Sequence, residues 1–565
     1  MQTRIFLAIA VILILCAAGC SSSDSGDNGG SASSLSSSVI DYQSVLDAQG
    51  YKIIDSVTTG DDTGYLAENK AGKKCVVLKG SAFNMGYQFG RLMPEATYRM
   101  TTEYPFNMVA DFIGFSKESA PGLFDLIFKT ANALCEGAVK DRSIPSYLLE
   151  EMKGMAAGAT DGGFKVKYED VLLVNEGIDA LYSIILSGIV PALNEANVIL
   201  KNSESAGLVK IEDGRVFFPK ANLSAMGCNG FVVSGKATVG GNVYHGRDFM
   251  FPTGGYYHKL ALMAVYLPDD GLPFVTLAAP GFVGLTTGLN AEGVSMGVDV
   301  VFGAATRATP GTGCLLVVRD IIQNSASLDD AVSRMKKLNR GVSWLYVLAD
   351  GNRSTKYTNG IVCETGMKED IDGNEFTYAP DLFKPLEKLL YAGLIRKLEK
   401  LPKAEDGVMV RDQNWVYPES FEGVQNFDGQ KENIDDLVVA TNHYIIPNMA
   451  FTTLTPLMLF MAGAEKKTSK SVERYDDLLG RLTADGVYGH IDYDTAKNLI
   501  DFMNPNRNTG QSDPWNGYYK VDGQVGGHHD IFDNTNLTME CLYGYYHPDE
   551  PWAKIDLKPF AGTDR

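Results

Sequence analysis

The chain has 565 residues, of which 45% are hydrophobic, and its formal net charge at pH 7 is −19. This length is enough for one large domain or two, and the composition is that of a globular protein. A surface of such negative charge repels nucleic acid, so we expect no nucleic-acid partner.

The N-terminus predicts an exported lipoprotein. Residues 1–20, MQTRIFLAIAVILILCAAGC, place one cation before an apolar stretch that is too short to span a bilayer. The ending AAGC resembles a bacterial lipoprotein box with Cys20 as the lipidated residue; an ordinary secretory signal is the alternative. Residues 21–38 are a Ser/Gly-rich flexible tether. We therefore expect a protein anchored by lipid in the cell envelope, at the outer membrane or facing the periplasm of a diderm bacterium.

Residues 39–227 are predicted to be rich in helix. After the strand-like CVVLK at 75–79, residues 146–163 carry apolar side chains at helical spacing and end in a glycine pair. A second buried helix is expected from residue 167 to about Pro191.

After residue 222 the pattern changes to short strands. Six strand candidates between residues 230 and 300 are separated by the turn signals GGN, DDG and NAEG, which predicts a meander of antiparallel hairpins. Two helices follow, the second opened by Ser327 with Asp330 three residues on, and then a hairpin over 343–359. A further helix is expected near 476–486, and a strand–turn–strand unit over 541–557. Helices, strands and helices in blocks, without βαβ alternation, predict an α+β fold.

The cysteines do not form a disulfide scaffold. Eight are present, none of those beyond Cys20 has C-x-x-C spacing, and Cys314 is expected to be a small buried helix residue.

Cys228 needs a different account, because it follows Gly227 directly and precedes a strand. A cysteine nucleophile acts as the thiolate and needs a base. One candidate is a histidine, and His443 is the best placed. The other is the cysteine's own α-amine, with a pKa of about 7.7–8.0, which exists only if the preceding peptide bond is broken. Glycine leaves its carbonyl open to attack, so the pair suits a chain that cuts itself at this bond.

Several stretches, in order, resemble N-terminal-nucleophile hydrolases of the penicillin acyltransferase-like (isopenicillin-N acyltransferase) branch, and more distantly choloylglycine hydrolases and acid ceramidase. They are GSAFNMGYQFGRLM (80–93), IPSYLLEEMKGMAAGA (144–159), EDVLLVNEGID (169–179), GCNGFVV with GGNVYHGRDF (227–249), GFVGLTTGLNAEGVSMGVD (281–299), VVATNHY (438–444), SKSVERYDDL (469–478) and HPDEPWAKIDL (547–557).

The resemblance implies a four-layer αββα sandwich and a mature enzyme of two chains, 39–227 and 228–565, that stay associated. Cys228 would perform the cleavage and then act as the nucleophile toward a carboxamide or related acyl bond. Asn290 lies where the family places an oxyanion-hole amide, although a turn residue is an equal reading of NAEG.

The hairpin strand after Cys228 carries Arg247 and Asp248, which face opposite sides of a sheet, so only one of them can point at the cysteine. Choloylglycine hydrolases read Gly-Arg-Asn-x-Asp here, and the second acid orients the nucleophile; this chain has Met250 in its place. Asp248 is expected to take the catalytic role, and an acid that only pairs with Arg247 is the alternative. The late motifs add four possible supporting residues: Asn442, His443, Ser471 and Arg474.

No cofactor or metal is expected. The cluster GGHHDIFD, with His528, His529, Asp530 and Asp533, is interpreted as a solvated loop because its spacing matches no metal motif. Phosphate-loop, dinucleotide and flavin patterns are absent from the sequence.

The sequence thus predicts a self-processing cysteine amidase that acts on a small acyl amide or peptide-like substrate. Hydrolysis is preferred to acyl transfer, because an exported enzyme has no cytosolic acyl-CoA supply. Two alternatives stay open: an uncut thiol hydrolase that pairs Cys228 with His443, and a non-catalytic surface lipoprotein that binds an acyl ligand in a degenerate cleft, which Met250 favours.

Overall fold

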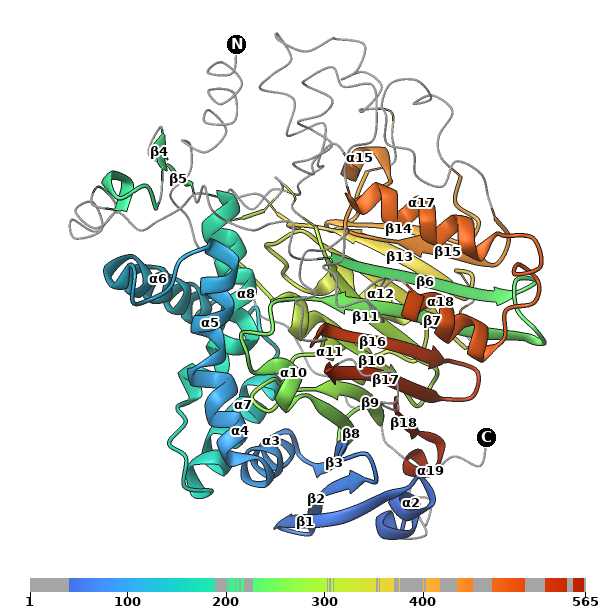
Figure 1. Cartoon of the computed structure of the whole chain (residues 1–565), viewed down its shortest axis with the longest axis horizontal. Coiled ribbons are helices and arrows are strands. Elements are labelled where there is room, and N and C mark those ends of the chain that lie inside the picture. The colour runs from blue at the N-terminus through green and yellow to red at the C-terminus, as the bar shows by residue number, and fades with distance from the viewer. Residues whose placement is uncertain are drawn as a thin grey trace, which may run out of the picture.

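Two large sheets stacked face to face form the centre of the molecule (Figure 1). The computed structural model describes residues 40–562, apart from 188–200, 202, 209, 213–214, 218–226, 302, 304–305, 308, 352–353, 355, 370–374, 376–399, 401–402, 417–433, 451–469, 503–523 and 546–551. The predicted signal, Cys20 and the tether lie outside the described residues, as does the predicted helix end near Pro191.

The first sheet has ten strands in the order β1-β2-β3-β8-β9-β10-β11-β12-β13-β14. Their bounds are β1 Tyr51–Thr59, β2 Asp62–Asn69, β3 Lys74–Gly80, β8 Leu262–Pro268, β9 Phe274–Ala278, β10 Thr287–Asn290, β11 Val294–Val300, β12 Trp344–Asp350, β13 Gly360–Thr365 and β14 Val408–Asp412. β3 runs parallel to β8, and the other neighbours in this sheet are antiparallel.

The second sheet has six antiparallel strands in the order β15-β6-β7-β16-β17-β18. Their bounds are β15 Leu437–Ala440, β6 Gly227–Gly235, β7 Gly241–Met250, β16 Gln524–Asp533, β17 Thr538–Tyr545 and β18 Ala553–Asp556. A separate pair, β4 Lys210–Glu212 and β5 Arg215–Phe217, lies outside both sheets.

Helices cover the outer faces of both sheets. α11 (Cys314–Asn324) and α12 (Leu328–Lys337) pack on the first sheet, and α17 (Lys470–Leu482) and α18 (Tyr493–Phe502) pack on the second. Successive side chains of β6 point to opposite faces of the second sheet. Val232 joins the core between the two sheets, and Phe231 joins the core under α17 and α18. The predicted αββα sandwich is confirmed.

Six helices from the first part of the chain lie along one end of the sandwich (Figure 1). They are α3 Ala82–Leu92, α4 Pro94–Thr102, α5 Tyr104–Ile113, α6 Pro121–Lys140, α7 Ser146–Asp161 and α8 Tyr168–Ser187. The same part also supplies α2 (Tyr42–Ala48) and three strands of the first sheet. The halves 39–227 and 228–565 therefore share a sheet through the β3–β8 pair.

Several local predictions are confirmed, and two are wrong. α7 ends at Gly162, Ser327 caps α12 by accepting a bond from the Asp330 amide, and Cys314 is a buried residue of α11. The strands after residue 222 are not one meander, because the chain leaves the second sheet after β7 and enters the first at β8. The GGHHDIFD segment is not a solvated loop: it forms β16, between β7 and β17, where a strand interior excludes water.

The six cysteines in the described residues are free and buried. Within the same residues we find no helix with the length and apolar character needed to cross a membrane.

Helices α3 and α7 approach closely at four glycines, two on each helix. Gly86 and Gly90 of α3 face backbone carbonyls of α7, and Gly154 and Gly158 of α7 face carbonyls of α3. A Cβ at Gly86 would lie 2.0 Å from the Glu151 carbonyl oxygen, which no rotation of a side chain can relieve. Two of the family-like motifs are thus helix-packing motifs rather than parts of a site.

We predict that Gly86→Ala lowers the free energy of unfolding by about 1–3 kcal/mol, because the added carbon must push the two helices apart. The matched control is Gly137→Ala in α6, where no atom lies within 4 Å of the new carbon. That change should stabilise by up to about 1 kcal/mol through helix propensity alone. Chemical denaturation measures both; equal effects of the two substitutions would contradict the packing argument.

Candidate active site

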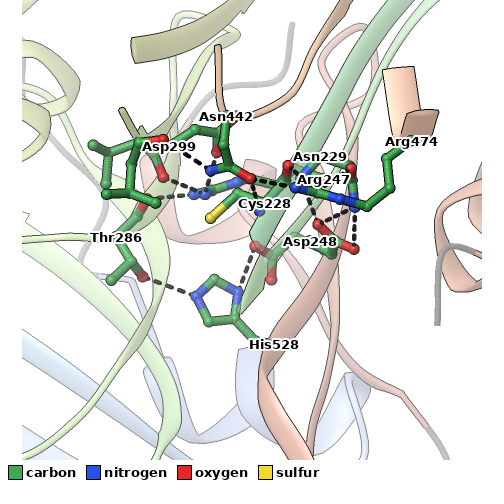
Figure 2. A network of polar contacts seen from close by, with 12 residues as sticks. Cys228, Asn229, Arg247, Asp248, Thr286, Asp299, Asn442, Arg474 and His528 are labelled. Atoms are coloured by element: carbon green, nitrogen blue, oxygen red, sulfur yellow. Dashed lines mark hydrogen bonds and ion pairs between the residues drawn. The ribbon is translucent and has the colours of Figure 1, made fainter. Parts of the chain in front are cut away.

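Both backbone polar atoms of Cys228 are bound by side chains from other elements. Its N–H donates to Asn442 Oδ1 at 2.7 Å, and its carbonyl oxygen accepts from Arg474 Nη1 at 2.8 Å. The carboxyl of Asp299, on β11 of the facing sheet, lies near its thiol. Figure 2 shows these residues in one network around the buried cysteine.

The face of β6 and β7 that carries Cys228 also carries Arg247. Its guanidinium pairs with Asp299 Oδ1 at 3.1 Å and donates to the carbonyls of Val298 (2.6 Å) and Thr286. Gly297 leaves room for it, since a Cβ there would lie 2.4 Å from Arg247 Nη1. A buried arginine needs such partners, because a buried charge without them is costly.

The electrostatics keep the intact thiol protonated. Burial raises the pKa of the Cys228 thiol to about 12, Asp299 adds to the rise, and Arg247 opposes it. Burial likewise raises the pKa of Asp299 to about 6, against the opposing charges of Arg247 and Arg474. Near neutral pH Asp299 is thus largely ionised and beside a neutral thiol.

Asp248 lies on the other face of the hairpin, so the prediction that it contacts the cysteine is wrong. It accepts bonds from the backbone and the side-chain amide of Asn229. Arg474, from α17, donates to Asn229 Oδ1 at 2.6 Å. Asp248 therefore stabilises the strand on the side away from the Cys228 thiol, and the acid near the thiol is Asp299 of the facing sheet.

Asn442 connects the strand bearing Cys228 to the facing sheet. Its Oδ1 also accepts from Arg474 Nη2 at 2.7 Å, and its Nδ2 donates to the Val300 carbonyl at 2.9 Å. The second Nδ2 proton has no partner among the described residues, which leaves one amide donor beside Cys228.

The neighbouring His443 turns away from Cys228. Its Nδ1 bonds the Ser471 hydroxyl at 2.8 Å and the Thr441 hydroxyl at 3.1 Å, and its ring packs against Tyr475 of α17. Ser471 and His443 hold α17 on the sheet, and the thiol–imidazole couple of the uncut alternative is not formed.

Asn290 occupies the turn between β10 and β11, and the prediction of an oxyanion-hole amide is wrong. Both protons of its Nδ2 are donated, to the carbonyls of Ile322 at 2.9 Å and Ser325 at 2.8 Å. Its Oδ1 accepts from two backbone amides of the turn. No donor of this amide is left for a substrate oxygen.

Sequence reasoning missed Asp299, although it is the last residue of the quoted 281–299 stretch. The strand alternation from Gly297 could have placed its side chain on an inner face. His528 and Asp530 were also missed as a pair; they are buried, with His528 Nδ1 at 2.7 Å from Asp530 Oδ2. Within the described part of the chain no group of three or more His, Cys, Asp or Glu side chains is placed to hold a metal ion.

An apolar cavity with an empty volume of about 720 Å³ adjoins the site. Helices α5, α6 and α8 form one side, and the end of β7, α10 (Tyr257–Leu260) and α11 form the other. Phe249, the strand partner of Cys228, and Thr286, whose carbonyl binds Arg247, both line it.

Two stacked sheets between helical layers give the chain the αββα fold of the N-terminal-nucleophile hydrolase type. Residues 243–362 match the family model described as acyl-coenzyme A:6-aminopenicillanic acid acyl-transferase, which takes in Arg247 and Asp299 but not Cys228. A protein of Archaeoglobus fulgidus, described as an uncharacterized protein, is 32% identical over 513 residues, covering 90% of this chain and 70% of the relative. The chain belongs to the family of the Archaeoglobus protein. Its residues 243–362 carry the acyl-transferase match, and the predicted resemblance is confirmed.

Solved structures show weaker similarity. The Caenorhabditis elegans ortholog of N-acylethanolamine-hydrolyzing acid amidase has 11% identity and a TM-score of 0.31, over 57% of this chain and 95% of its own. Penicillin V acylase from Agrobacterium tumefaciens has 8% identity and a TM-score of 0.29, over 56% and 83%. The match to the acyl-transferase model supports an enzyme that acts on acyl amides, by hydrolysis or transfer.

Burial raises the pKa of Asp248 to about 7, although Asn229 and Arg474 oppose the rise. The folded protein therefore keeps a proton that the unfolded chain releases near pH 4, so this group's contribution to stability falls as the pH rises from 4 to 7. Asp248→Asn cannot titrate. We predict that its melting temperature rises relative to wild type between pH 5 and pH 8, measured by calorimetry.

The control is Asp485→Asn at an exposed position, whose melting profile should run parallel to that of wild type. A parallel profile for Asp248→Asn as well would show that Asp248 does not titrate in this range.

Proposed function

We propose that the protein is a cysteine amide hydrolase that cuts its own chain at the Gly227–Cys228 bond and then uses Cys228 as an N-terminal nucleophile. One observation carries the proposal: separate side chains hold the nitrogen and the carbonyl oxygen of Cys228, and the carboxyl of Asp299 lies near its sulfur. A structural cysteine in a strand needs no such partners for its side chain, and burial alone would serve it.

Self-cleavage would use Asp299 as the base. As the Cys228 sulfur bonds to the Gly227 carbonyl carbon, the thiol proton passes to Asp299. The Gly227–Cys228 carbon–nitrogen bond then breaks, and the proton goes on to the nitrogen, which leaves as an amine. Water next cleaves the Gly227 thioester, restoring the thiol and releasing the Gly227 carboxylate.

In the cut enzyme the new α-amine is the proton acceptor. Asn442 Oδ1, which lies 2.7 Å from this nitrogen, would keep it beside the sulfur, and the nearby Arg474 charge would favour its neutral form. The amine takes the thiol proton as the sulfur attacks the substrate carbonyl and gives it to the leaving amine. The second N–H of the Asn442 amide is the donor we assign to the developing oxyanion.

The acyl group of the substrate would enter the cavity beside Phe249. Its walls come mostly from apolar side chains of the helices, which suits a hydrophobic acyl chain better than a charged peptide. Water would release the acyl group from the thioester. We further propose that the enzyme is exported and lipid-anchored at Cys20, with both chains held together by the shared sheet.

We expect purified wild-type protein to contain two chains, the second beginning Cys228-Asn229-Gly230, because the Gly227–Cys228 bond is broken during maturation. Cys228→Ala should stay one chain, as it lacks the attacking sulfur. Mass spectrometry and N-terminal sequencing measure both. Cys75→Ala, a change of another buried cysteine in β3, is the control and should be cut like wild type. An active wild-type protein in one uncut chain would overturn the proposal.

Asp299→Asn should slow self-cleavage by about 10²–10⁴-fold, the usual contribution of a positioned general base. In wild type the cleavage rate should fall as the pH drops below about 6, because Asp299 takes up a proton there. The variant should lose this pH dependence. The half-time of the precursor, followed by gel electrophoresis from pH 5 to 8, is the measurement; an unchanged rate for Asp299→Asn would remove Asp299 from the mechanism.

A further inference from the structure

A buried chain of polar groups runs from β17 to the wall of the cavity. Cys541 Sγ donates to Asp530 Oδ1 at 2.9 Å, and Asp530 Oδ2 lies 2.7 Å from His528 Nδ1. His528 Nε2 lies 2.9 Å from the hydroxyl of Thr286, which lines the cavity (Figure 2). The Thr286 hydroxyl, the His528 imidazole and the Asp530 carboxylate are thus connected in series, with the hydroxyl at the cavity.

The donors in this chain can be assigned. Burial disfavours the ionised form of Asp530, whereas the neighbouring His528 favours it, and the pKa of Asp530 lies below its usual value. The Asp530 carboxylate therefore accepts a hydrogen bond from the Nδ1–H of His528. We assign the tautomer with Nδ1–H, in which Nε2 accepts from the Thr286 hydroxyl at 2.9 Å. The hydroxyl of Tyr257, which also lines the cavity, lies near that of Thr286.

This hydroxyl pair is the polar part of an otherwise apolar wall. Among the described residues that line the cavity, the third hydroxyl, that of Tyr104, is directed to the Pro252 carbonyl at 3.3 Å. Burying an imidazole and a carboxylate costs free energy that apolar packing would not. This series of polar groups ends at the cavity on the Thr286 hydroxyl oxygen, which can accept a hydrogen bond. It points to a ligand that carries a hydrogen-bond donor.

Thr286 lies close to the reacting end of the cavity. The same Arg247 guanidinium that pairs with Asp299, the partner of the Cys228 thiol, also donates to the Thr286 carbonyl. A donor that reaches Thr286 must therefore be on the acyl chain near its carbonyl, rather than at its far end.

We infer that the preferred substrates are amides of hydroxylated acyl groups, and that Thr286, oriented by His528 and Asp530, selects a hydroxyl near the scissile carbonyl. This rests on the proposed function for the cleavage itself. Thr286 is a specificity residue, and the bond it makes to the substrate hydroxyl adds to binding without taking part in acyl transfer.

The test compares three amides with the same leaving amine: dodecanoyl, 3-hydroxydodecanoyl and 12-hydroxydodecanoyl. At pH 8, wild type should cleave the 3-hydroxy amide with a kcat/KM about tenfold above that of the other two, the value of one neutral hydrogen bond. Thr286→Val should lose this preference, so that its kcat/KM for the 3-hydroxy amide equals its kcat/KM for the dodecanoyl amide. Thr286→Ser, which restores the hydroxyl, should recover the preference.

Binding of the three free acids to the Cys228→Ala protein, measured by calorimetry, separates this inference from the proposed function. Cleavage of all three amides at equal rates, or a preference that survives in Thr286→Val, overturns the role of Thr286 but leaves the hydrolase intact. Preferential binding of 3-hydroxydodecanoic acid without cleavage of any amide supports the role of Thr286 and overturns the proposed function.

Discussion

The pairing of Arg247 with Asp299 between the two sheets is the interaction on which the rest of the site depends. Neither charge could lie there alone, because removing one partner leaves the other buried and uncompensated. The carbonyls of Val298 and Thr286 use further donors of the guanidinium, and Gly297 leaves room for it. The pair thereby fixes both the acid beside the thiol and the strand segment that carries the cavity hydroxyl.

The fold was predictable because its signals are local or periodic. Ser327 with Asp330, the glycine stop after α7 and the alternation of β6 each depend on neighbours along the chain, and the structure agrees with them. The assignment of strands to sheets was not predictable, because it depends on contacts between distant segments. The turn after β7 gives no sign that the next strand joins another sheet, and β16 was mistaken for a loop because its histidines and aspartates are paired only in three dimensions.

The residues of the site also differ in how well the sequence could predict them. Cys228 stood out because a cysteine after glycine at the head of a strand has a chemical meaning of its own. Asn290 and Asp248 were chosen by likeness to motifs, and each proved to hold the backbone instead: Asn290 in its turn and Asp248 behind Asn229. Asp299 could not be recognised from sequence, because its contact with Cys228 crosses between sheets and depends on a register that no short-range pattern encodes.

The parallel pairing of β3 with β8 bears on whether the chain folds before or after the proposed cleavage. Six pairs of residues join these strands, which lie on opposite sides of the Gly227–Cys228 bond. The helices that enclose most of the cavity come before that bond, and the groups around the sulfur come after it. If the bond is cut as proposed, assembly is best completed while the polypeptide is continuous. Two pieces synthesised apart would have to meet and build a ten-stranded sheet from separate partners, a bimolecular search that a single covalent chain avoids.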